Sequence, residues 1–480
     1  MDKKYVFILL GVASFFAIIA SFFLMRNVES SDAQELNAVN GTCVVNLIDL
    51  SKSFAAAITD NNQIINGLRN EDCFALQALN STISWQARSQ WQPPIKVVCS
   101  KIQSSSIQSS LLCPPFDWNP KLLGDEQDID SLLISCMDSV ISTSKDINNL
   151  SDYTDISGAL TMASMIGSRK YRNKYITILS DFQEDLPNHN SQANYKLDRE
   201  SVIMIHRPGI DERHGVYEYI NRIKNWKATL LDNGAKDVQV IQGFAATESA
   251  IGTLISTAQK LDNEITVSLS ILIDPKKNVV SELRSDDVEN NKLTRLVRFC
   301  GRYTEDLGST VIATFAIMGP SGLNLDVLNP VEYKSVLIRE RVPGGPVCDI
   351  QEFKMRLEEQ SMLVYNRVNR ITSSSLNTDV SGTLAIMSLT DFKPDKHYIV
   401  IISDFDDTDY LQDNFLFEFH PDTHVIMLHL PTHADGSDPN AYIKRITQWK
   451  KKLIEAGASE ATDIPLYSVT ETDFEKVFTE

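Results

Sequence analysis

The segment Asp49-Leu50-Ser51-Lys52-Ser53 places one carboxylate and two hydroxyls at every second position. Further along the chain, Thr154 and Asp181 offer another hydroxyl and another carboxylate. Mg²⁺ prefers about six hard oxygen ligands in an octahedron, several of them water, and these side chains supply oxygens of that kind. The chemistry that they suggest is the binding of a divalent cation, Mg²⁺ or in its place Ca²⁺ or Mn²⁺.

The surroundings of these residues indicate that they lie at one edge of a sheet. Apolar runs at 43–48 and 175–179 lead to Asp49 and Asp181, and such runs are typical of parallel strands covered on both faces. The two serines open a helical segment, and Thr154 opens a second strand-to-helix region. Ligands of a doubly wound sheet bind beyond the carboxyl ends of its strands, so we expect the five side chains to converge there.

Apolar runs alternate with amphipathic helical segments along the rest of the chain. This alternation predicts an α/β protein with doubly wound, mostly parallel sheets. Thr247 and Thr470 are predicted to cap the N-terminus of a last helix in each half. The predicted strands are 43–48, 95–99, 175–179, 202–205, 267–273, 311–317, 398–402 and 425–428.

An internal repeat divides the chain into two halves. Ser180-Asp181-Phe182 recurs as Ser403-Asp404-Phe405, an offset of 223 residues (404 minus 181). The same offset relates 219–227 to 442–450. Similarity that keeps its register over this distance is not expected by chance.

The repeat predicts two domains, one at 40–263 and one at 264–480. No Gly-, Ser- or Pro-rich spacer lies between them. We therefore expect the two domains to pack against each other instead of moving freely.

The motif in the first repeat resembles the metal-ion-dependent adhesion site of the von Willebrand factor A (vWA) family. The resemblance covers about 40–263 and, more weakly, 264–480, and it implies a Rossmann-like fold in both. It also implies that serine hydroxyls contact the cation directly, that the aspartates act largely through bound water, and that an Asp or Glu of a partner protein completes the coordination. The residues that match the family pattern are Asp49, Ser51, Ser53, Thr154 and Asp181.

The second repeat departs from this pattern. Its matching strand end reads Asp274-Pro275-Lys276-Lys277-Asn278, so Lys276 and Asn278 stand at the two serine positions, while Thr378 and Asp404 are retained. Lys276 either pairs with Asp274 and Asp404 and replaces the metal electrostatically, or it points to solvent. Both interpretations predict a degenerate site without metal in the second repeat.

Two other groups of polar residues have structural or chemical interpretations. His206 and His429 end equivalent strands, which favours a shared structural hydrogen bond over a ligand role in one site. Glu184 and Asp185 lie close to the first motif and could serve as general acid or base. The sequence shows no activated nucleophile beside them, so we expect a protein that is not an enzyme.

The N-terminus has the pattern of a membrane anchor. Lys3 and Lys4 precede an apolar run at 5–25, which as a helix spans roughly 31 Å, about the thickness of a bilayer core. We expect a cytoplasmic tip and transmembrane helix at 1–27, a linker at 28–39, and a body that is periplasmic or extracellular. A cleaved signal peptide is the alternative, and it also exports the body.

The seven cysteines favour structural disulfides, because export permits them and no pair has CxxC spacing. Their placement predicts bridges from Cys73 to Cys113 and from Cys300 to Cys348, and a third from Cys99 to Cys136. The odd count leaves one cysteine over. Cys43, in an apolar strand, is the expected thiol.

Composition narrows the class of partner. The chain has 63 acidic and 45 basic residues, a net charge of -18, which repels nucleic acids and anionic lipid surfaces. The motif and anchor together predict a membrane-anchored protein-binding module that uses a divalent cation to capture a carboxylate of a protein partner. The alternatives are a structural subunit of an envelope or secretion assembly and a metal-dependent hydrolase.

Overall fold

A computed structural model of the chain describes the body of the protein. The predicted anchor lies outside the described residues, and so does the linker except for its last residue. No helix within the described part of the chain is long and apolar enough to span a bilayer. The described residues are 39–58, 64–66, 68–89, 95–102, 111–112, 115–118, 129–146, 150–166, 171–185, 195–209, 215–255, 265–283, 293, 310–321, 323, 325–328, 330–334, 350–370, 378–406, 417–432, 434–436, 438–470, 472–473 and 476.

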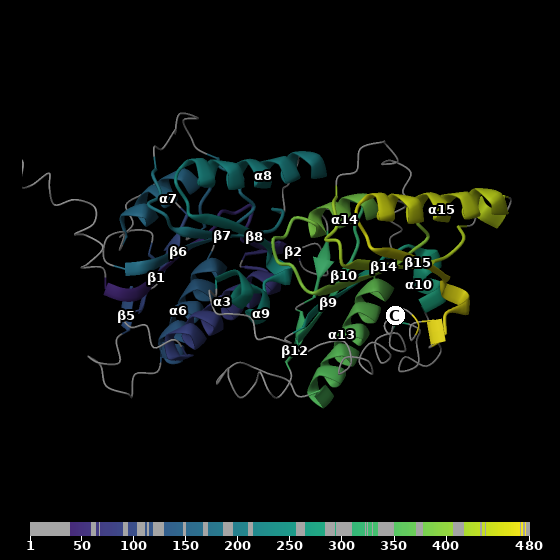
Figure 1. Ribbon diagram of the computed structural model, residues 1–480, viewed down its shortest axis with the longest axis horizontal. Helices are drawn as coiled ribbons and strands as arrows, with labels where there is room; N and C mark the ends of the chain where they lie inside the picture. The colour runs from purple at the N-terminus through teal and green to yellow at the C-terminus, as the bar shows by residue number, and fades with distance from the viewer. Residues whose placement is uncertain are drawn as a thin grey trace, which may run out of the picture.

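The described residues form two mostly parallel sheets with helices on both faces (Figure 1), as predicted for an α/β protein. The first sheet has the strand order β5-β4-β1-β6-β7-β8, and only β5 runs antiparallel to its neighbour. Its strands are β1 (Val39–Ile48), β4 (Ile95–Lys101), β5 (Phe116–Trp118), β6 (Tyr171–Ser180), β7 (Ser201–His206) and β8 (Asp237–Gln242). A separate small ribbon pairs β2 (Ala56–Ile58) with β3 (Ile64–Asn66).

The second sheet repeats this arrangement with the order β11-β10-β9-β13-β14-β15, and β12 also pairs with β10. Its parallel core is β10, β9, β13, β14 and β15. The strands are β9 (Thr266–Ile273), β10 (Thr310–Ile317), β11 (Asp326–Val327), β12 (Val331–Lys334), β13 (Lys396–Ser403), β14 (Thr423–His429) and β15 (Glu460–Pro465). All eight predicted strands are confirmed, each within a strand of equal or greater length.

Helices cover both faces of each sheet, as Figure 1 shows. One layer holds α7 (Ile156–Met165), α8 (Val216–Asp232), α14 (Val380–Met387) and α15 (Pro439–Glu455). The opposite layer holds α3 (Asn70–Ser89), α6 (Ile129–Lys145), α9 (Glu248–Ile255) and α13 (Ile350–Arg370), and the short α10 (Lys277–Leu283) follows β9. The predicted cap of α9 is confirmed, because the Thr247 hydroxyl accepts a hydrogen bond from the Ala250 amide.

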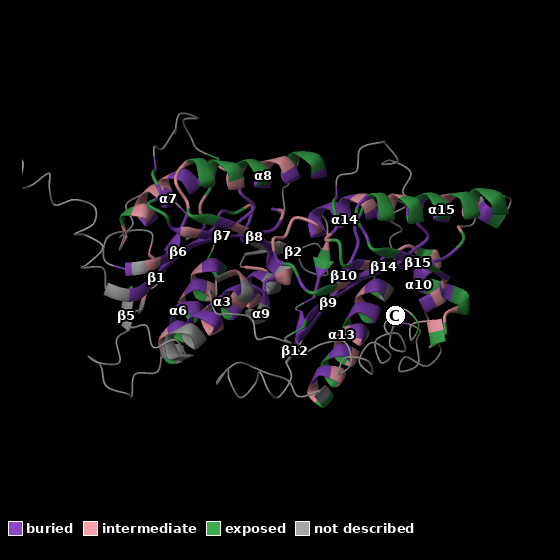
Figure 2. Cartoon of the chain, in the orientation of Figure 1, coloured by how far each residue is buried: buried purple, intermediate pink, exposed green. Residues whose placement is uncertain are grey.

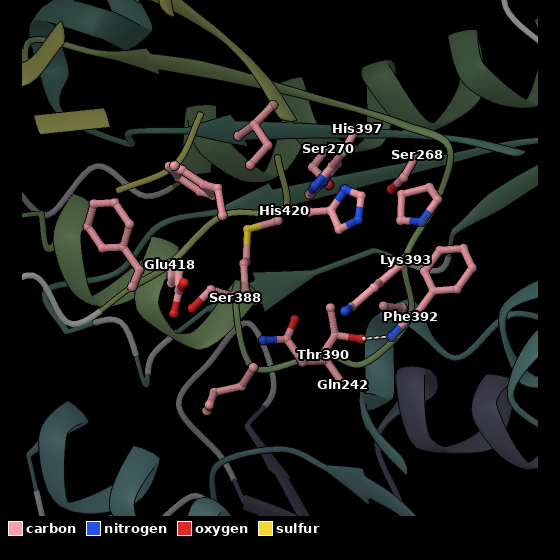
Figure 3. A pocket seen from close by; sticks show the side chains of 18 of the residues that line it. Gln242, Ser268, Ser270, Ser388, Thr390, Phe392, Lys393, His397, Glu418 and His420 are labelled. Carbon is pink, nitrogen blue, oxygen red and sulfur yellow. Dashed lines mark hydrogen bonds between the residues drawn. The ribbon is translucent and has the colours of Figure 1, made fainter. Parts of the chain in front are cut away.

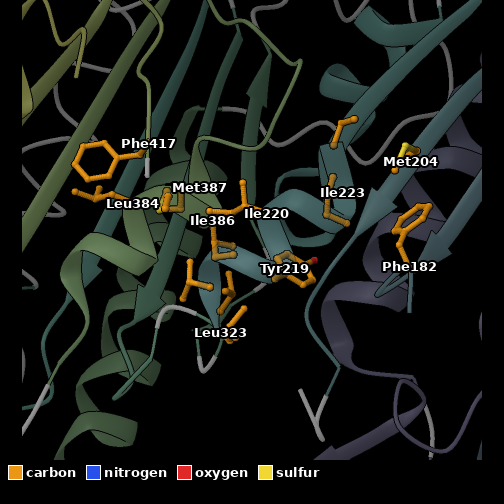
Figure 4. Packing of buried hydrophobic residues seen from close by; sticks show 14 of the residues in the cluster. Phe182, Met204, Tyr219, Ile220, Ile223, Leu323, Leu384, Ile386, Met387 and Phe417 are labelled. Carbon is orange, nitrogen blue, oxygen red and sulfur yellow. The ribbon is translucent and has the colours of Figure 1, made fainter. Parts of the chain in front are cut away.

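The strands are buried along most of their length, while the outer faces of α8 and α15 are exposed (Figure 2). A single apolar cluster extends from the first repeat into the second, and Figure 4 shows Tyr219 and Ile220 of α8 near Ile386 and Met387 of α14. The two repeats therefore pack against each other, as the absence of a spacer predicted.

The second repeat also covers the edge of the first sheet. The Asp391 amide donates to the Val240 carbonyl at 2.6 Å, and the Val240 amide donates to the Asp391 carboxylate at 2.7 Å. Lys227 of α8 forms an ion pair with the same carboxylate at 2.7 Å. Because β8 is an edge strand, these contacts satisfy backbone groups that would otherwise face solvent.

Candidate metal centre

The first candidate site lies at the point where the strand order of the first sheet reverses. The chain passes from β1 to β4 on one side and then to β6 on the other, so the carboxyl ends of β1 and β6 border a crevice. Asp49 directly follows β1 and Asp181 directly follows β6. This is the position at which open α/β sheets bind their ligands.

Asp49 is held in a fixed orientation by its neighbours. Its Oδ1 accepts from the Ser51 amide at 2.8 Å, and its Oδ2 accepts from the Ser180 hydroxyl at 2.7 Å. The side chain is fully buried, and this burial raises the pKa of Asp49, while the hydrogen bonds oppose the rise. A cation beside the carboxylate would further stabilise its charged form.

Backbone hydrogen bonds join the three segments that carry the predicted ligands. The Lys52 amide donates to the Ser151 carbonyl at 2.9 Å, which ties the DxSxS segment to the turn before α7. Thr154 and Asp185 exchange two backbone hydrogen bonds of 3.0 and 2.9 Å, which tie that turn to the loop after β6. The predicted convergence of the three segments is thus present in the structure.

The side chains in this crevice are oxygen donors of the expected type. The hydroxyls of Ser51 and Ser53 lie 3.2 Å apart, and Ser51, Thr154 and Asp181 are buried. Two carboxylates and three hydroxyls from three tied segments fit a hard divalent cation with coordinated water. No group of three or more His, Cys, Asp or Glu that could hold a metal is found among the described residues.

Glu184, a candidate acid or base, has a structural role in this arrangement. Its carboxylate accepts from the amide of Ser157 at 2.8 Å and lies 3.2 Å from the hydroxyl of the same residue, in the first turn of α7. Asp155 caps the same helix by accepting from the Gly158 amide at 2.7 Å. Burial raises the pKa of Glu184, and its hydrogen bonds to Ser157 oppose the rise. Both carboxylates hold the start of α7 beside Thr154.

Two residues after β7 complete the crevice and were not singled out from the sequence. Arg207 forms a buried ion pair with Asp72 at 2.8 Å, donates to the Phe54 carbonyl, and lies over the Phe54 ring at 3.8 Å. Gly209 lies so close to Asp181 that a Cβ atom there would sit 2.6 Å from Oδ2. The second repeat has Pro431-Thr432 where the first has Pro208-Gly209, and this difference was the available signal.

The degenerate site of the second repeat contains an ammonium group in the same crevice. Lys276 Nζ lies 2.8 Å from Asp404 Oδ1 and 3.8 Å from Asp274 Oδ2, and the side chain is 10% exposed. The side-chain Nδ2 of Asn278 donates to Oδ2 of Asp404 at 3.1 Å. The Thr378 hydroxyl donates to Asp274 at 2.6 Å. Lys276 therefore pairs with Asp274 and Asp404, as the first of its two interpretations predicted. The interpretation in which Lys276 points to solvent is wrong.

The framework around both crevices is nearly identical. Ser403 donates to Asp274 at 2.7 Å, the distance at which Ser180 donates to Asp49. The residues after the two strand-end aspartates, Phe182 and Phe405, have φ angles of 58° and 54°. A tryptophan indole donates to each of these phenylalanine carbonyls, at 2.9 and 3.1 Å. The two repeats can therefore be compared residue by residue at this site.

The two strand-end histidines also correspond. Nδ1 of His206 lies 2.8 Å from the Tyr219 hydroxyl, and Nδ1 of His429 contacts the Tyr442 hydroxyl in the same way. The predicted shared structural hydrogen bond is confirmed. His206 differs in one respect, because its Nε2 also reaches the Leu389 carbonyl of the second repeat at 2.9 Å.

The cysteines correct part of the disulfide prediction. Cys99 keeps its thiol, and burial raises its pKa to about 11; Cys136 forms a disulfide, but not with Cys99. Cys73 also keeps its thiol, so its predicted bridge to Cys113 is wrong as well. The sulfurs of Cys99 and Cys136 do lie 2.8 Å apart, so the sequence brought the right neighbours together but not the right bond. Cys43 is a buried thiol, as predicted.

The remaining cysteine prediction concerns Cys300 and Cys348. Both of these residues lie outside the described part of the chain, as does Cys113. Their pairing stays a prediction.

Comparisons with known proteins do not assign this chain to a family. No protein-family model matches it, and no curated protein matches its sequence. Among solved structures, it is similar to proximal thread matrix protein 1 from the mussel byssus, with 10% sequence identity over 92% of this chain and 94% of that one. The TM-score of 0.26 is too low for that similarity to carry an argument about fold or function.

Proposed function

We propose that the protein is a membrane-anchored, extracytoplasmic binding protein with two vWA-like domains, of which the first holds a divalent cation that captures a carboxylate of a partner protein. In this proposal Ser51, Ser53 and Thr154 bind the cation through their hydroxyls. Asp49 and Asp181 hold its coordinated water. The cation supplies Lewis acidity and positive charge toward an Asp or Glu of the partner.

The observation that carries the proposal is the position of Lys276. The second repeat places a positive charge between two strand-end aspartates, within 2.8 Å of one and 3.8 Å of the other. The first repeat keeps both aspartates, as Asp49 and Asp181, and replaces the ammonium and amide side chains by the hydroxyls of Ser51 and Ser53. The equivalent crevice in the second repeat holds a positive charge. The crevice in the first repeat has the same two aspartates and hydroxyls in place of that charge, which suits a metal ion.

The neighbouring lysine of the first repeat supports the same proposal. Lys52 points outward and pairs with Asp152 at 2.6 Å, where both side chains are at least half exposed. This surface pair leaves the crevice to the oxygen ligands. The net charge of -18 adds a second argument, because a cation bound in the crevice would offset the repulsion between this acidic protein and a carboxylate of the partner.

A capture experiment with tagged full-length protein in native membranes tests this function. We expect the same partner to be captured with Mg²⁺, to be lost with EDTA, and to be lost with Ser51→Ala. Asn278→Ala is the control, because it changes a side chain of the degenerate site, at the position that corresponds to Ser53, and it should capture the partner normally. Capture that is indifferent to EDTA and to Ser51→Ala would contradict the docking role and favour a structural subunit.

A further inference from the structure

A cavity of about 720 Å³ lies between the two repeats, and none of the five proposed metal ligands lines it. The first repeat contributes Lys224, Gln242 and Ala245, and the second contributes the rest of the wall. Figure 3 shows His397, Ser270 and His420 on one side of the cavity, and Gln242 and Thr390 on the other. Cavities of this size at domain interfaces are common sites for small molecules.

The repeat shows that some polar residues of the cavity wall are particular to the second half of the chain. Ser268 and Ser270 precede the strand-end Asp274 by six and four residues, and Cys43 and Val45 precede Asp49 by the same distances. Cys43 and Val45 are fully buried in the apolar core of the first repeat. The second repeat has hydroxyls at the two positions, and these hydroxyls line the cavity.

The neighbouring strand β13 also has a polar residue that faces the cavity, where the first repeat has a paired charge. His397 pairs in register with Ser268, as Lys174 pairs with Cys43. In the first repeat, Lys174 is buried in an ion pair with Glu200 at 2.9 Å. His397 instead lines the cavity, with Nε2 at 3.5 Å from the Ser270 hydroxyl.

The polar groups of the wall favour a ligand that accepts hydrogen bonds. Gln242 is 2% exposed, and its Nε2 atom has no hydrogen-bond partner among the described residues. A buried amide donor without a partner is unfavourable, so a ligand that accepts from it would stabilise the site. Burial, with a smaller contribution from His420, lowers the pKa of His397 to about 4, so its ring is neutral at pH 7.

The lysines of the wall favour an anionic group on the ligand. Lys393 and Lys224 both line the cavity, and the Lys393 side chain points into it (Figure 3). Of the two acidic residues in the wall, Glu455 pairs with Lys451 at 3.4 Å, and Glu418 lies away from Lys393. The rest of the wall is largely apolar and includes Met387, Leu389, Phe392, Phe417 and Phe419.

We infer that this cavity binds a small organic carboxylate with an apolar body, whose carboxylate accepts from Gln242 and pairs with Lys393 while the apolar body lies against the phenylalanines. The ligand contacts both repeats and stabilises their contact. This site is independent of the proposed metal centre, because it shares no residue with it.

Calorimetric titration of the full-length chain in detergent micelles, with EDTA present throughout, tests the inference. Three probes of similar shape distinguish the ligand class: phenylacetate, phenylacetamide and phenethylamine. We expect phenylacetate to bind at least about tenfold more tightly than the other two, after subtraction of a titration into empty micelles. EDTA removes the metal centre from the measurement, so failure here and failure of the docking function are distinguishable.

Two variants locate the binding. Ser268→Cys combined with Ser270→Val gives these two wall positions the residues that the first repeat has, so the variant should fold. It removes both hydroxyls and narrows the cavity beside His397, so we expect weaker phenylacetate binding. Lys393→Gln changes an exposed side chain and should weaken binding by about tenfold, while Lys396→Gln, an exposed lysine outside the cavity, should not. Unchanged phenylacetate binding in both cavity variants, or equal binding of the three probes, would overturn the inference.

Discussion

The ammonium of Lys276 lies 2.8 Å from a carboxylate oxygen of Asp404 in the second repeat. The residues at these positions in the first repeat are Ser51 and Asp181. The serine-to-aspartate hydrogen bonds and positive-φ phenylalanines that frame the crevice are the same in both repeats. The same framework therefore surrounds a pair of strand-end aspartates in both repeats, with an ammonium group beside them in the second repeat and hydroxyl groups in the first.

Asp391 is predicted to hold the second repeat against the edge of the first sheet. Asp391→Ala removes the carboxylate that accepts from the Val240 amide and from Lys227, and we expect a loss of about 1–2 kcal/mol in the free energy of unfolding. Hydrogen exchange should become faster in β8.

The control for this prediction is Asp395→Ala. The Asp395 carboxylate accepts from the Thr266 amide at 2.6 Å, within the second repeat alone. This variant should leave exchange in β8 unchanged. Equal exchange of β8 in the Asp391 variant and the wild type would contradict the proposed role of Asp391.

The buried ion pair between Arg207 and Asp72 is predicted to stabilise the DxSxS segment. Asp72→Asn leaves the Arg207 charge buried without a carboxylate, and we expect a loss of about 3 kcal/mol in urea unfolding. Because Arg207 contacts Phe54, next to Ser53, cation affinity should fall as well. Asp152→Asn, which removes an exposed pair with Lys52, should cost less than about 1 kcal/mol. Similar losses in the two variants would argue against this role.

His206 is predicted to make the contact between the repeats sensitive to acid. The Leu389 carbonyl can only accept, so Nε2 of His206 donates to it, and Nδ1 of the neutral ring accepts from Tyr219. Burial lowers the pKa of His206 to about 4, from an ordinary value of 6.5. The unfolded chain thus binds more protons between these values, and stability falls as the pH falls.

The contribution of His206 should be fully present above pH 6.5 and lost progressively down to about pH 4, with a total of about 3 kcal/mol. Urea unfolding of the wild type and of His206→Gln at pH 7 and pH 5 measures about 2 kcal/mol of this total. His397 titrates in both proteins, so the difference between them isolates His206. A wild type and a variant with the same dependence on pH would contradict this assignment.

The central strands could be predicted because their residues are apolar on both faces, as in the run from Tyr398 to Ile402. The edge strands β8 and β15 were not predicted, since residues such as Asp237, Gln239 and Asp463 interrupt their apolar pattern. Such strands are identified by their neighbours in the sheet and not by composition.

The candidate site could be predicted in part. Asp49, Ser51 and Asp181 follow strands, so their residue types and positions were enough to expect convergence. The roles of Arg207 and Gly209 depend on how closely the loop after β7 approaches Phe54 and Asp181, and no local pattern encodes that distance. The cavity between the repeats could not be predicted either, because it depends on how the two repeats pack against each other.

Counting bound Mn²⁺ in the full-length protein and two reciprocal variants tests the central claim most directly. The measurement is electron paramagnetic resonance, with competition by Mg²⁺. Ser51→Lys gives the first repeat the ammonium of the second, and Lys276→Ser combined with Asn278→Ser gives the second repeat the hydroxyls of the first. We predict one ion for the wild type, none for Ser51→Lys and two for the double variant. An equal Mn²⁺ count in the wild type and in a folded Ser51→Lys protein would contradict the account.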